Sequence, residues 1–132
     1  MSYSRASNGI TVTVRSIYLE DQSDPDRNTY VWAYQVRIEN HRPDTVQLLR
    51  RTWQITDGRG RVQVVEGDGV VGEQPVLEPG EAFEYTSGTP LETPSGIMVG
   101  RYHMVATTSG ERFDAEIPAF SLDGPGHNRQ LH

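Results

Sequence analysis

The chain has 132 residues, a formal net charge of -6 and no cysteine, and all 12 of its basic residues are arginines. This length suits one domain, which would bury about two-thirds of its unfolded surface on folding. The missing cysteines exclude a disulfide scaffold, a cysteine nucleophile and a thiolate zinc site, and they agree with a cytoplasmic location.

The N-terminal residues, MSYSRASNGI, are polar and lack the apolar core of a secretory signal. The uninterrupted apolar runs, such as residues 97–99, fall far short of the roughly 20 residues of a membrane-spanning helix. An acidic chain with scattered arginines also lacks the basic patch typical of nucleic-acid binding. We therefore expect a soluble cytoplasmic protein that binds neither membranes nor nucleic acids.

Apolar residues alternate along residues 9–20, which predicts a β-strand. The alternation changes phase after Val14, which predicts a bulge near Arg15 or Ser16. The next strand shows the clearest pattern, with a polar face opposite one continuous apolar face. That apolar face consists of Tyr30, Trp32, Tyr34, Val36 and Ile38.

A third strand is predicted over residues 45–56, and its alternation changes phase between Leu48 and Leu49. The pattern places Arg51 on the same face as Trp53. An unpaired buried guanidinium is costly, so Arg51 must either reach solvent or meet a carboxylate. The sequence DGRG at residues 57–60 then predicts a hairpin that returns the chain through residues 62–65.

Further strands are predicted around Phe83 and Tyr85, along residues 98–106 and along residues 113–120. Residues 87–96 are rich in Gly, Pro, Ser and Thr and are predicted to form a loop. No stretch shows a convincing helical period. The expected core anchors are Trp32, Trp53, Phe83 and Tyr85.

About seven short strands separated by turns predict an all-β fold, an antiparallel sandwich of the immunoglobulin-like or fibronectin type III-like kind. We expect the sandwich domain to span residues 9–123. It should lie between a flexible N-terminus at residues 1–8 and a flexible C-terminal tail at residues 124–132.

Gly67, Gly69 and Gly72 have the GxGxxG spacing of dinucleotide-binding proteins. That fingerprint needs a helix after the glycines, whereas the following EQPVLEPG contains two prolines. Two interpretations stay open: the backbone amides bind a phosphate-rich ligand, or the glycines adopt positive φ angles in a tight loop. Acidic residues flank the motif and oppose the first interpretation: Glu66, Asp68 and Glu73.

No metal or catalytic constellation stands out. The four histidines show neither HxH nor HxxxH spacing (His41, His103, His127 and His132). An alternating acidic loop, Asp21, Asp24 and Asp26, lacks the glycine and the distant glutamate of a calcium-binding EF-hand. Arg101 and His103 share one strand face, which could bind a surface anion or simply be a polar face. No GxSxG nucleophile elbow occurs.

The glycine-rich segment and its surroundings strongly resemble the ApaG family. The matching residues extend over residues 9–122 and include Tyr30–Tyr34, Asn40, Leu48, Leu49, Arg51, Trp53, Ile55, Gly67–Pro75, Leu77, Pro79–Glu81, Phe83, Tyr85–Gly88, Thr93, Pro94, Gly96, Met98, Gly100, Tyr102, Met104, Gly110, Phe113, Ile117, Pro118 and Phe120. Thr52 departs from the pattern, because relatives often carry Tyr or His at this position.

The resemblance implies a fibronectin type III-like sandwich that is also used as an appended interaction module. It further implies a link to cobalt resistance and magnesium efflux, and no established catalysis. We therefore expect a non-catalytic module, without a cofactor, that binds a protein partner. The alternatives are pyrophosphate or nucleotide binding by the Gly67–Gly72 loop, and direct binding of a divalent cation.

Overall fold

The computed structural model describes residues 2–125 of the chain, and these form strands and two short 3-10 turns. The strands are β1 (Ser2–Ser7), β2 (Ile10–Tyr18), β3 (Tyr30–Asn40), β4 (Val46–Asp57), β5 (Val62–Asp68), β6 (Val76–Leu77), β7 (Ala82–Leu91), β8 (Ser95–Ala106) and β9 (Arg112–Asp123). The 3-10 turns η1 (Glu20–Gln22) and η2 (Pro25–Arg27) lie between β2 and β3. Within residues 2–125, no helix is long and apolar enough to cross a lipid bilayer.

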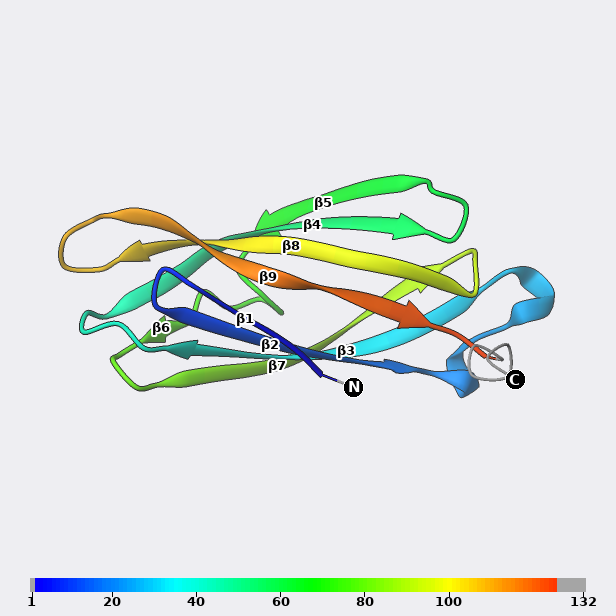
Figure 1. Cartoon of the computed structure of the whole chain (residues 1–132), viewed down its shortest axis with the longest axis horizontal. Helices are drawn as coiled ribbons and strands as arrows, with labels where there is room; N and C mark the ends of the chain where they lie inside the picture. The colour runs from blue at the N-terminus through cyan, green and yellow to red at the C-terminus, as the bar shows by residue number, and fades with distance from the viewer. Residues whose placement is uncertain (1, 126–132) are drawn as a thin grey trace.

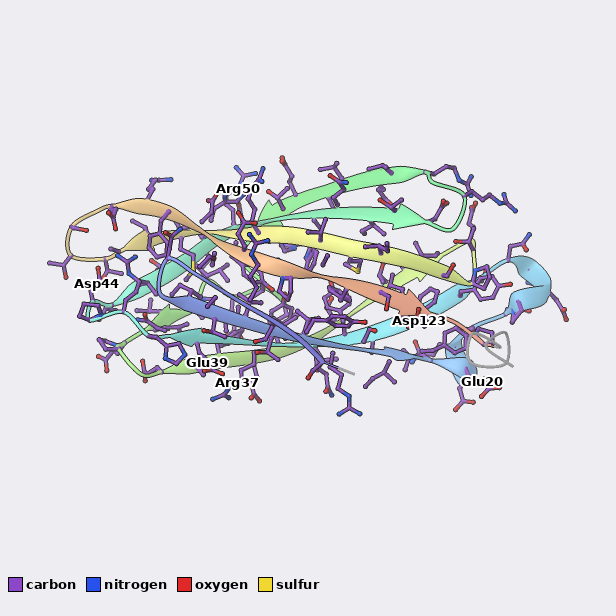
Figure 2. All side chains as sticks on the ribbon, viewed as in Figure 1. Glu20, Arg37, Glu39, Asp44, Arg50 and Asp123 are labelled. Atoms are coloured by element: carbon purple, nitrogen blue, oxygen red, sulfur yellow. The ribbon has the colours of Figure 1, made fainter. Side chains whose placement is uncertain are left out.

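The strands form two antiparallel sheets that pack face to face, which confirms the predicted all-β sandwich (Figure 1). One sheet has the order β1-β2-β3-β7, and the other has the order β5-β4-β8-β9 with β6 paired to β4. Charged side chains lie on both outer faces. Figure 2 shows Arg50 pointing away from the sandwich on the side of β4, and Arg37 and Glu39 on the side of β3.

The core lies between the sheets and is built from the alternating inward residues of both. Three of the four expected anchors, Trp32, Trp53 and Tyr85, are buried, whereas Phe83 is partly exposed at the edge of the core. The apolar face predicted for β3 is also correct: four of its residues are buried, and Tyr30 is partly buried and packs against the core. The other largest fully buried side chains are Tyr102, Phe120, Ile10, Ile38, Leu48, Met98, Met104, Ile117 and Leu122.

The two phase changes in the sequence have different structural causes. The pairing of β4 with β8 shifts register between Leu48 and Arg50, which places a bulge where the alternation of β4 breaks. The pairing of β2 with β3 is continuous from Ile10 to Tyr18, so the bulge predicted near Arg15 or Ser16 is absent. There the alternation simply stops, because Ile17 lies on the outer face and is only partly buried.

Two further segments differ from expectation. Residues 2–7, predicted to be flexible, form β1 and pair with β2 over their whole length. Residues 87–91, predicted as a loop, continue β7 and pair with β3. Both are edge strands, where polar residues and proline are tolerated because one side of the backbone has no strand partner. The proposed C-terminal tail falls mostly on residues 126–132, which lie outside the described residues.

The sandwich is closed along one side only. On that side β1 lies alongside β9, where the Tyr3 hydroxyl lies 2.9 Å from Ser121 Oγ and the Glu116 N–H donates to Ser7 Oγ at 2.8 Å (Figure 1). On the opposite side, the edge strands β5 and β7 belong to different sheets, and two hollows lie between them. The open β5–β7 side therefore gives solvent access to the space between the sheets.

Candidate functional site

The glycine motif lies at the open β5–β7 side. Gly67 belongs to β5, while Gly69 and Gly72 lie in the connection to β6, with φ angles of +62° and +80°. Val71 has a φ of +44°, and Val70 and Glu73 exchange two backbone hydrogen bonds of 2.8 and 2.9 Å across the turn. Positive φ at both central residues is the type I′ geometry, so this segment is a tight two-residue turn.

Several backbone amides of this segment are committed to the protein itself. The Gly69 N–H donates to the Leu49 carbonyl at 2.8 Å, and the Val70 N–H donates to Glu73. The chain then continues to β6 without a helix, as the prolines predicted. A phosphate cradle needs several adjacent amides that point at the ligand, and here two neighbouring amides already have partners.

Gly67 instead makes room for Arg51. The two residues are paired between β4 and β5, and a Cβ atom at position 67 would lie 2.8 Å from Nη1 and 2.9 Å from Nη2 of Arg51. The guanidinium thus lies directly over the backbone of Gly67. The glycine is required here for close approach of an arginine.

Arg51 Nη1 donates to the carbonyl oxygens of Asp68 at 3.0 Å and Gly69 at 2.8 Å. The sequence predicted a carboxylate partner or a route to solvent, whereas the structure provides two main-chain carbonyls from the glycine-rich segment. The side chain is partly exposed and borders a hollow of about 230 Å³. The motif and the arginine therefore form one structural unit.

Three tyrosines from both sheets lie next to Arg51 at the core. The hydroxyls of Tyr85 and Tyr102 are 2.5 Å apart and buried. Burial raises the pKa of Tyr85, against an opposing effect of its hydrogen bond with Tyr102. Burial also raises the pKa of Tyr102 well above its ordinary value, and the neighbouring Tyr85 and Tyr34 add to that rise. Both phenols are therefore neutral at physiological pH.

Trp53 lines the inner wall of the hollow. Its ring packs edge-on against Tyr34, with the ring centroids 5.5 Å apart, and the residue is only 2% exposed. Its indole N–H is buried and has no hydrogen-bond partner among the described residues. An unpaired buried donor costs about 1–3 kcal/mol, and the residue that carries it lines the hollow. The hollow is lined by Tyr34, Arg51, Trp53, Asp68, Val70, Val71, Gly72, Tyr85 and Ser87.

A second polar cluster lies on the outer face of the β5-β4-β8-β9 sheet. His103 Nε2 is 2.7 Å from the Thr52 hydroxyl, and His103 Nδ1 is 3.0 Å from Asp114 Oδ1. Arg101 and His103, which share a strand face as predicted, both approach Asp114, with Arg101 Nε 3.8 Å from Oδ2. The carboxylate already neutralises this face, which weakens the surface-anion interpretation.

The proposed cation ligands do not converge within residues 2–125, where no three His, Asp or Glu side chains form a group able to hold a metal. Asp21 lies in η1 and Asp26 in η2, while Asp24 approaches Arg27 at 3.5 Å. His41 Nε2 lies 3.0 Å from Glu39. His127 and His132 lie outside the described residues.

The sequence indicated the glycines and Arg51 but missed the tyrosines beside them. Tyr34, Tyr85 and Tyr102 were each visible only as an apolar position of a separate strand. Their common signal is a hydroxyl-bearing aromatic residue on the core face of three strands, next to an inward arginine. A buried phenol needs a hydrogen-bond partner, so this combination indicates a polar centre inside the sandwich.

The comparisons with known proteins agree with the sequence resemblance. The model of the ApaG domain matches residues 20–106. The chain is 65% identical to Protein ApaG of Rhodospirillum centenum, with 96% of each chain covered. It is 59% identical to Protein ApaG of Parvibaculum lavamentivorans, with 98% of this chain and 99% of the relative covered.

A crystal structure shows the same fold. The putative ApaA protein from Bordetella pertussis superposes with a TM-score of 0.84 at 52% identity, covering 88% of this chain and 94% of the other. High identity over nearly the full length and a shared fold leave one conclusion: the chain belongs to the ApaG family.

Proposed function

We propose that this protein is a non-catalytic cytoplasmic binding module, and that it recognises an extended segment of a partner protein along β5. The observation that carries the proposal is the uncovered edge of this strand. β5 is the outermost strand of its sheet, and its first residues, VQVV at 62–65, carry neither charge nor proline. Val62 and Val64 are 57% and 59% exposed.

The other sheet edges carry features that prevent pairing with another chain. β9 contains Pro118 and alternating charged residues, β7 contains Pro90 and Glu84, and β1 has only six residues. The first half of β5 has none of these protections within the described structure. Such an edge is a template for an added strand, and a partner that supplies one would satisfy its free backbone groups.

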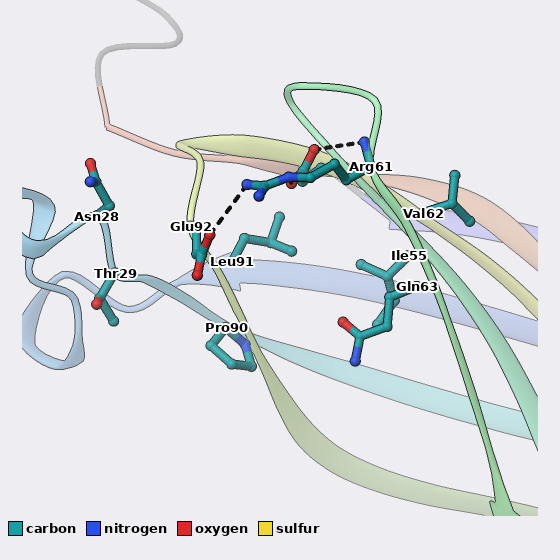
Figure 3. Close-up of a pocket in the computed structure, with 10 residues that line it drawn as sticks. Asn28, Thr29, Ile55, Arg61, Val62, Gln63, Pro90, Leu91 and Glu92 are labelled. Atoms are coloured by element: carbon teal, nitrogen blue, oxygen red, sulfur yellow. Dashed lines mark hydrogen bonds and ion pairs between the residues drawn. The ribbon is translucent and has the colours of Figure 1, made fainter.

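The side chains of an added strand would alternate between two surfaces. One is the outer face, where Val62 and Val64 are exposed and Ile97, itself 52% exposed, lies across Thr56 of β4 from Val62. The other is a groove of about 440 Å³ between β5 and β7, where Gln63 and Ile55 face Pro90 and Leu91 (Figure 3). The outer face favours apolar side chains, and the groove combines apolar with polar lining residues, so the expected partner segment is extended, with apolar side chains toward the outer face.

An ion pair marks one end of the groove. Arg61, which precedes β5, bonds Asp57 at 2.9 Å and reaches Glu92, which follows β7, at 3.2 Å (Figure 3). These contacts satisfy the nearby charges within the protein. In this proposal, the link to cobalt resistance and magnesium efflux expected from the family resemblance is an effect of the partner, not of bound metal.

The test selects peptides from a display library on the purified protein and maps the best binder by amide hydrogen exchange. We expect protection to rise at residues 62–65. Val64→Lys should weaken binding by about tenfold or more, because a charge on an edge strand opposes strand addition. Being exposed, the substitution should change stability by only about 0.5 kcal/mol.

The matched control is Val76→Lys, since Val76 is 52% exposed on β6 of the same sheet and should leave binding unchanged. Binding that survives Val64→Lys, or protection that rises only on another strand, would show that β5 is not the recognition edge.

A further inference from the structure

The hollow beside Arg51 contains an unusual excess of hydrogen-bond donors. A guanidinium carries five N–H donors. Two of them, both on Nη1, bond the Asp68 and Gly69 carbonyls. Nε and Nη2 of Arg51 have no hydrogen-bond partner among the described residues. These two atoms form the edge of a guanidinium that binds a carboxylate or phosphate in a bidentate manner.

Arg42 shows what this edge does elsewhere in the same molecule. Its Nε donates to Asp44 Oδ1 at 2.8 Å and its Nη2 donates to Asp44 Oδ2 at 3.1 Å. Arg51 has the equivalent edge at the wall of the hollow but has no carboxylate on it. Asp68 also borders the hollow, yet its carboxylate approaches Arg50, its neighbour across the strands, at 3.8 Å.

The surroundings add further donors, and the carboxylate that borders the hollow, that of Asp68, approaches Arg50 at 3.8 Å. The indole N–H of Trp53 is buried without a partner, and the hydroxyls of Tyr34 and Ser87 make no hydrogen bond within residues 2–125. A hollow of about 230 Å³ exceeds the roughly 30 Å³ that one water molecule occupies in the liquid. It therefore has room for a small oxyanion with some of its hydration.

We propose that the hollow bordered by Arg51, Trp53, Tyr34 and Ser87 is a binding site for an oxyanion group, a carboxylate or a phosphate. The side chain of Arg51 binds the oxyanion through Nε and Nη2. The Gly67–Gly72 segment holds the opposite end of the guanidinium through its carbonyls. The glycine motif thus serves anion binding indirectly, by positioning an arginine, and this site is distinct from the β5 edge.

The guanidinium of Arg51 and the Gly67–Gly72 segment depend on each other. The carbonyls of Asp68 and Gly69 fix the plane of the guanidinium, and Gly67 lets it lie against the backbone. A guanidinium fixed in advance loses less side-chain entropy when it binds a ligand. The partly buried location also strengthens its attraction for an anion relative to an exposed arginine.

The experiment titrates the isotope-labelled protein with acetate, inorganic phosphate and pyrophosphate in separate arms, up to about 10 mM, a range that detects millimolar affinity. The readouts are the Nε–Hε signal of Arg51 and the indole N–H signals. We expect the Arg51 and Trp53 signals to move and the Trp32 signal to stay, because the Trp32 indole already donates to the Asp123 carbonyl at 3.0 Å. The arm with the tightest binding identifies the source of the oxyanion.

Arg51→Met should abolish binding, and Arg51→Lys should weaken it about tenfold, since an ammonium lacks the bidentate edge. The matched control is Arg101→Met, which removes an equal charge from the outer face of the same sheet, away from the lining of the hollow, and should bind as before. Equal losses in both methionine variants would reduce the effect to net charge and overturn the proposal.

Two other results would overturn it: no response of Arg51 in any arm, or signals that move at the Gly67–Gly72 amides while Arg51→Met still binds. If Arg51→Met does not fold, the Arg51→Lys variant and the Arg51 signal of the unmodified protein decide the outcome.

Discussion

Substituting alanine at Gly67, Gly69 and Gly72 in turn separates two effects on stability, that of close packing around the added Cβ atom and that of a positive φ angle. At Gly69, a Cβ atom would lie 2.2 Å from the Glu73 carbonyl oxygen, whereas real Cβ contacts stay beyond 3.0 Å, so the backbone must move by 3.0 - 2.2 = 0.8 Å. That movement opens the Val70–Glu73 pair of hydrogen bonds, each worth about 0.5–1.5 kcal/mol. The positive φ of +62° adds about 1–2 kcal/mol for alanine.

The expected cost of Gly69→Ala is therefore about 2–5 kcal/mol. Gly72→Ala should cost only about 1–2 kcal/mol, because its φ is +80° but nothing lies within 4 Å of the added Cβ. Gly67→Ala meets only the end of the Arg51 side chain, so we expect a change in stability below about 1 kcal/mol with a displaced Arg51 signal.

Urea unfolding of the three variants, with the Arg51 Nε–Hε signal recorded for each folded protein, measures both effects. A phosphate cradle would instead make the three glycines equivalent in stability and different only in binding. Equal unfolding free energies for Gly69→Ala and Gly72→Ala, or an unmoved Arg51 signal in Gly67→Ala, would refute the packing argument.

Three further predictions concern stability. The raised pKa values of Tyr85 and Tyr102 mean that the native state keeps protons that the unfolded state releases near pH 10. The free energy of unfolding should therefore decrease as the pH rises above about 10, and it should decrease less steeply in Tyr85→Phe. Denaturant midpoints at increasing alkaline pH measure this. Val71→Asn should stabilise the protein by about 0.5–1.5 kcal/mol in urea unfolding, because a β-branched residue is strained at a φ of +44° whereas asparagine tolerates this conformation. An unchanged urea midpoint would contradict the prediction. Arg42→Met should cost about 1–3 kcal/mol by the same assay, since Arg42 bonds Asp44 through two atoms and lies 4.2 Å from the centre of the Phe113 ring. Because Arg42 lowers the pKa of Asp44, the difference in unfolding free energy between protein and variant should shrink as the pH falls below about 4.

Local alternation was enough to predict the sandwich, because both sheets keep one face in the core. It was least informative at the edges. β1 carries polar residues on both faces, and the second half of β7 is rich in residues typical of turns. The second half of β7 owes its strand conformation to pairing with β3, which is distant in sequence, so no local pattern could show it. β1 pairs with the adjacent β2 across a two-residue turn at Asn8 and Gly9, both with positive φ, and this Asn-Gly pair is a local hairpin signal that the prediction missed.

The site was predictable only in its parts. The sequence indicated that the glycines permit tight backbone conformations, and that Arg51 shares the face of Trp53. It could not indicate that Arg51 would bond the Asp68 and Gly69 carbonyls, because that contact depends on the bulge near Leu49 and on the register between β4 and β5. Main-chain acceptors are present at every residue and leave no trace in side-chain patterns.

The contact of β1 with β9 also constrains how the protein is made. β1 leaves the ribosome before β9, yet the two strands pack together, with Tyr3 next to Ser121 and its ring 6.4 Å from that of Phe120. Synthesis must therefore pass residue 123 before β9 can cover this side of the sandwich. Until then, the apolar residues of β1 and β2 that contact β9 stay exposed. Contacts between residues this distant in sequence also slow folding. During synthesis, the vulnerable period of this chain is the time needed to add β9, when a chaperone that shields β2 and β3 would have the greatest effect.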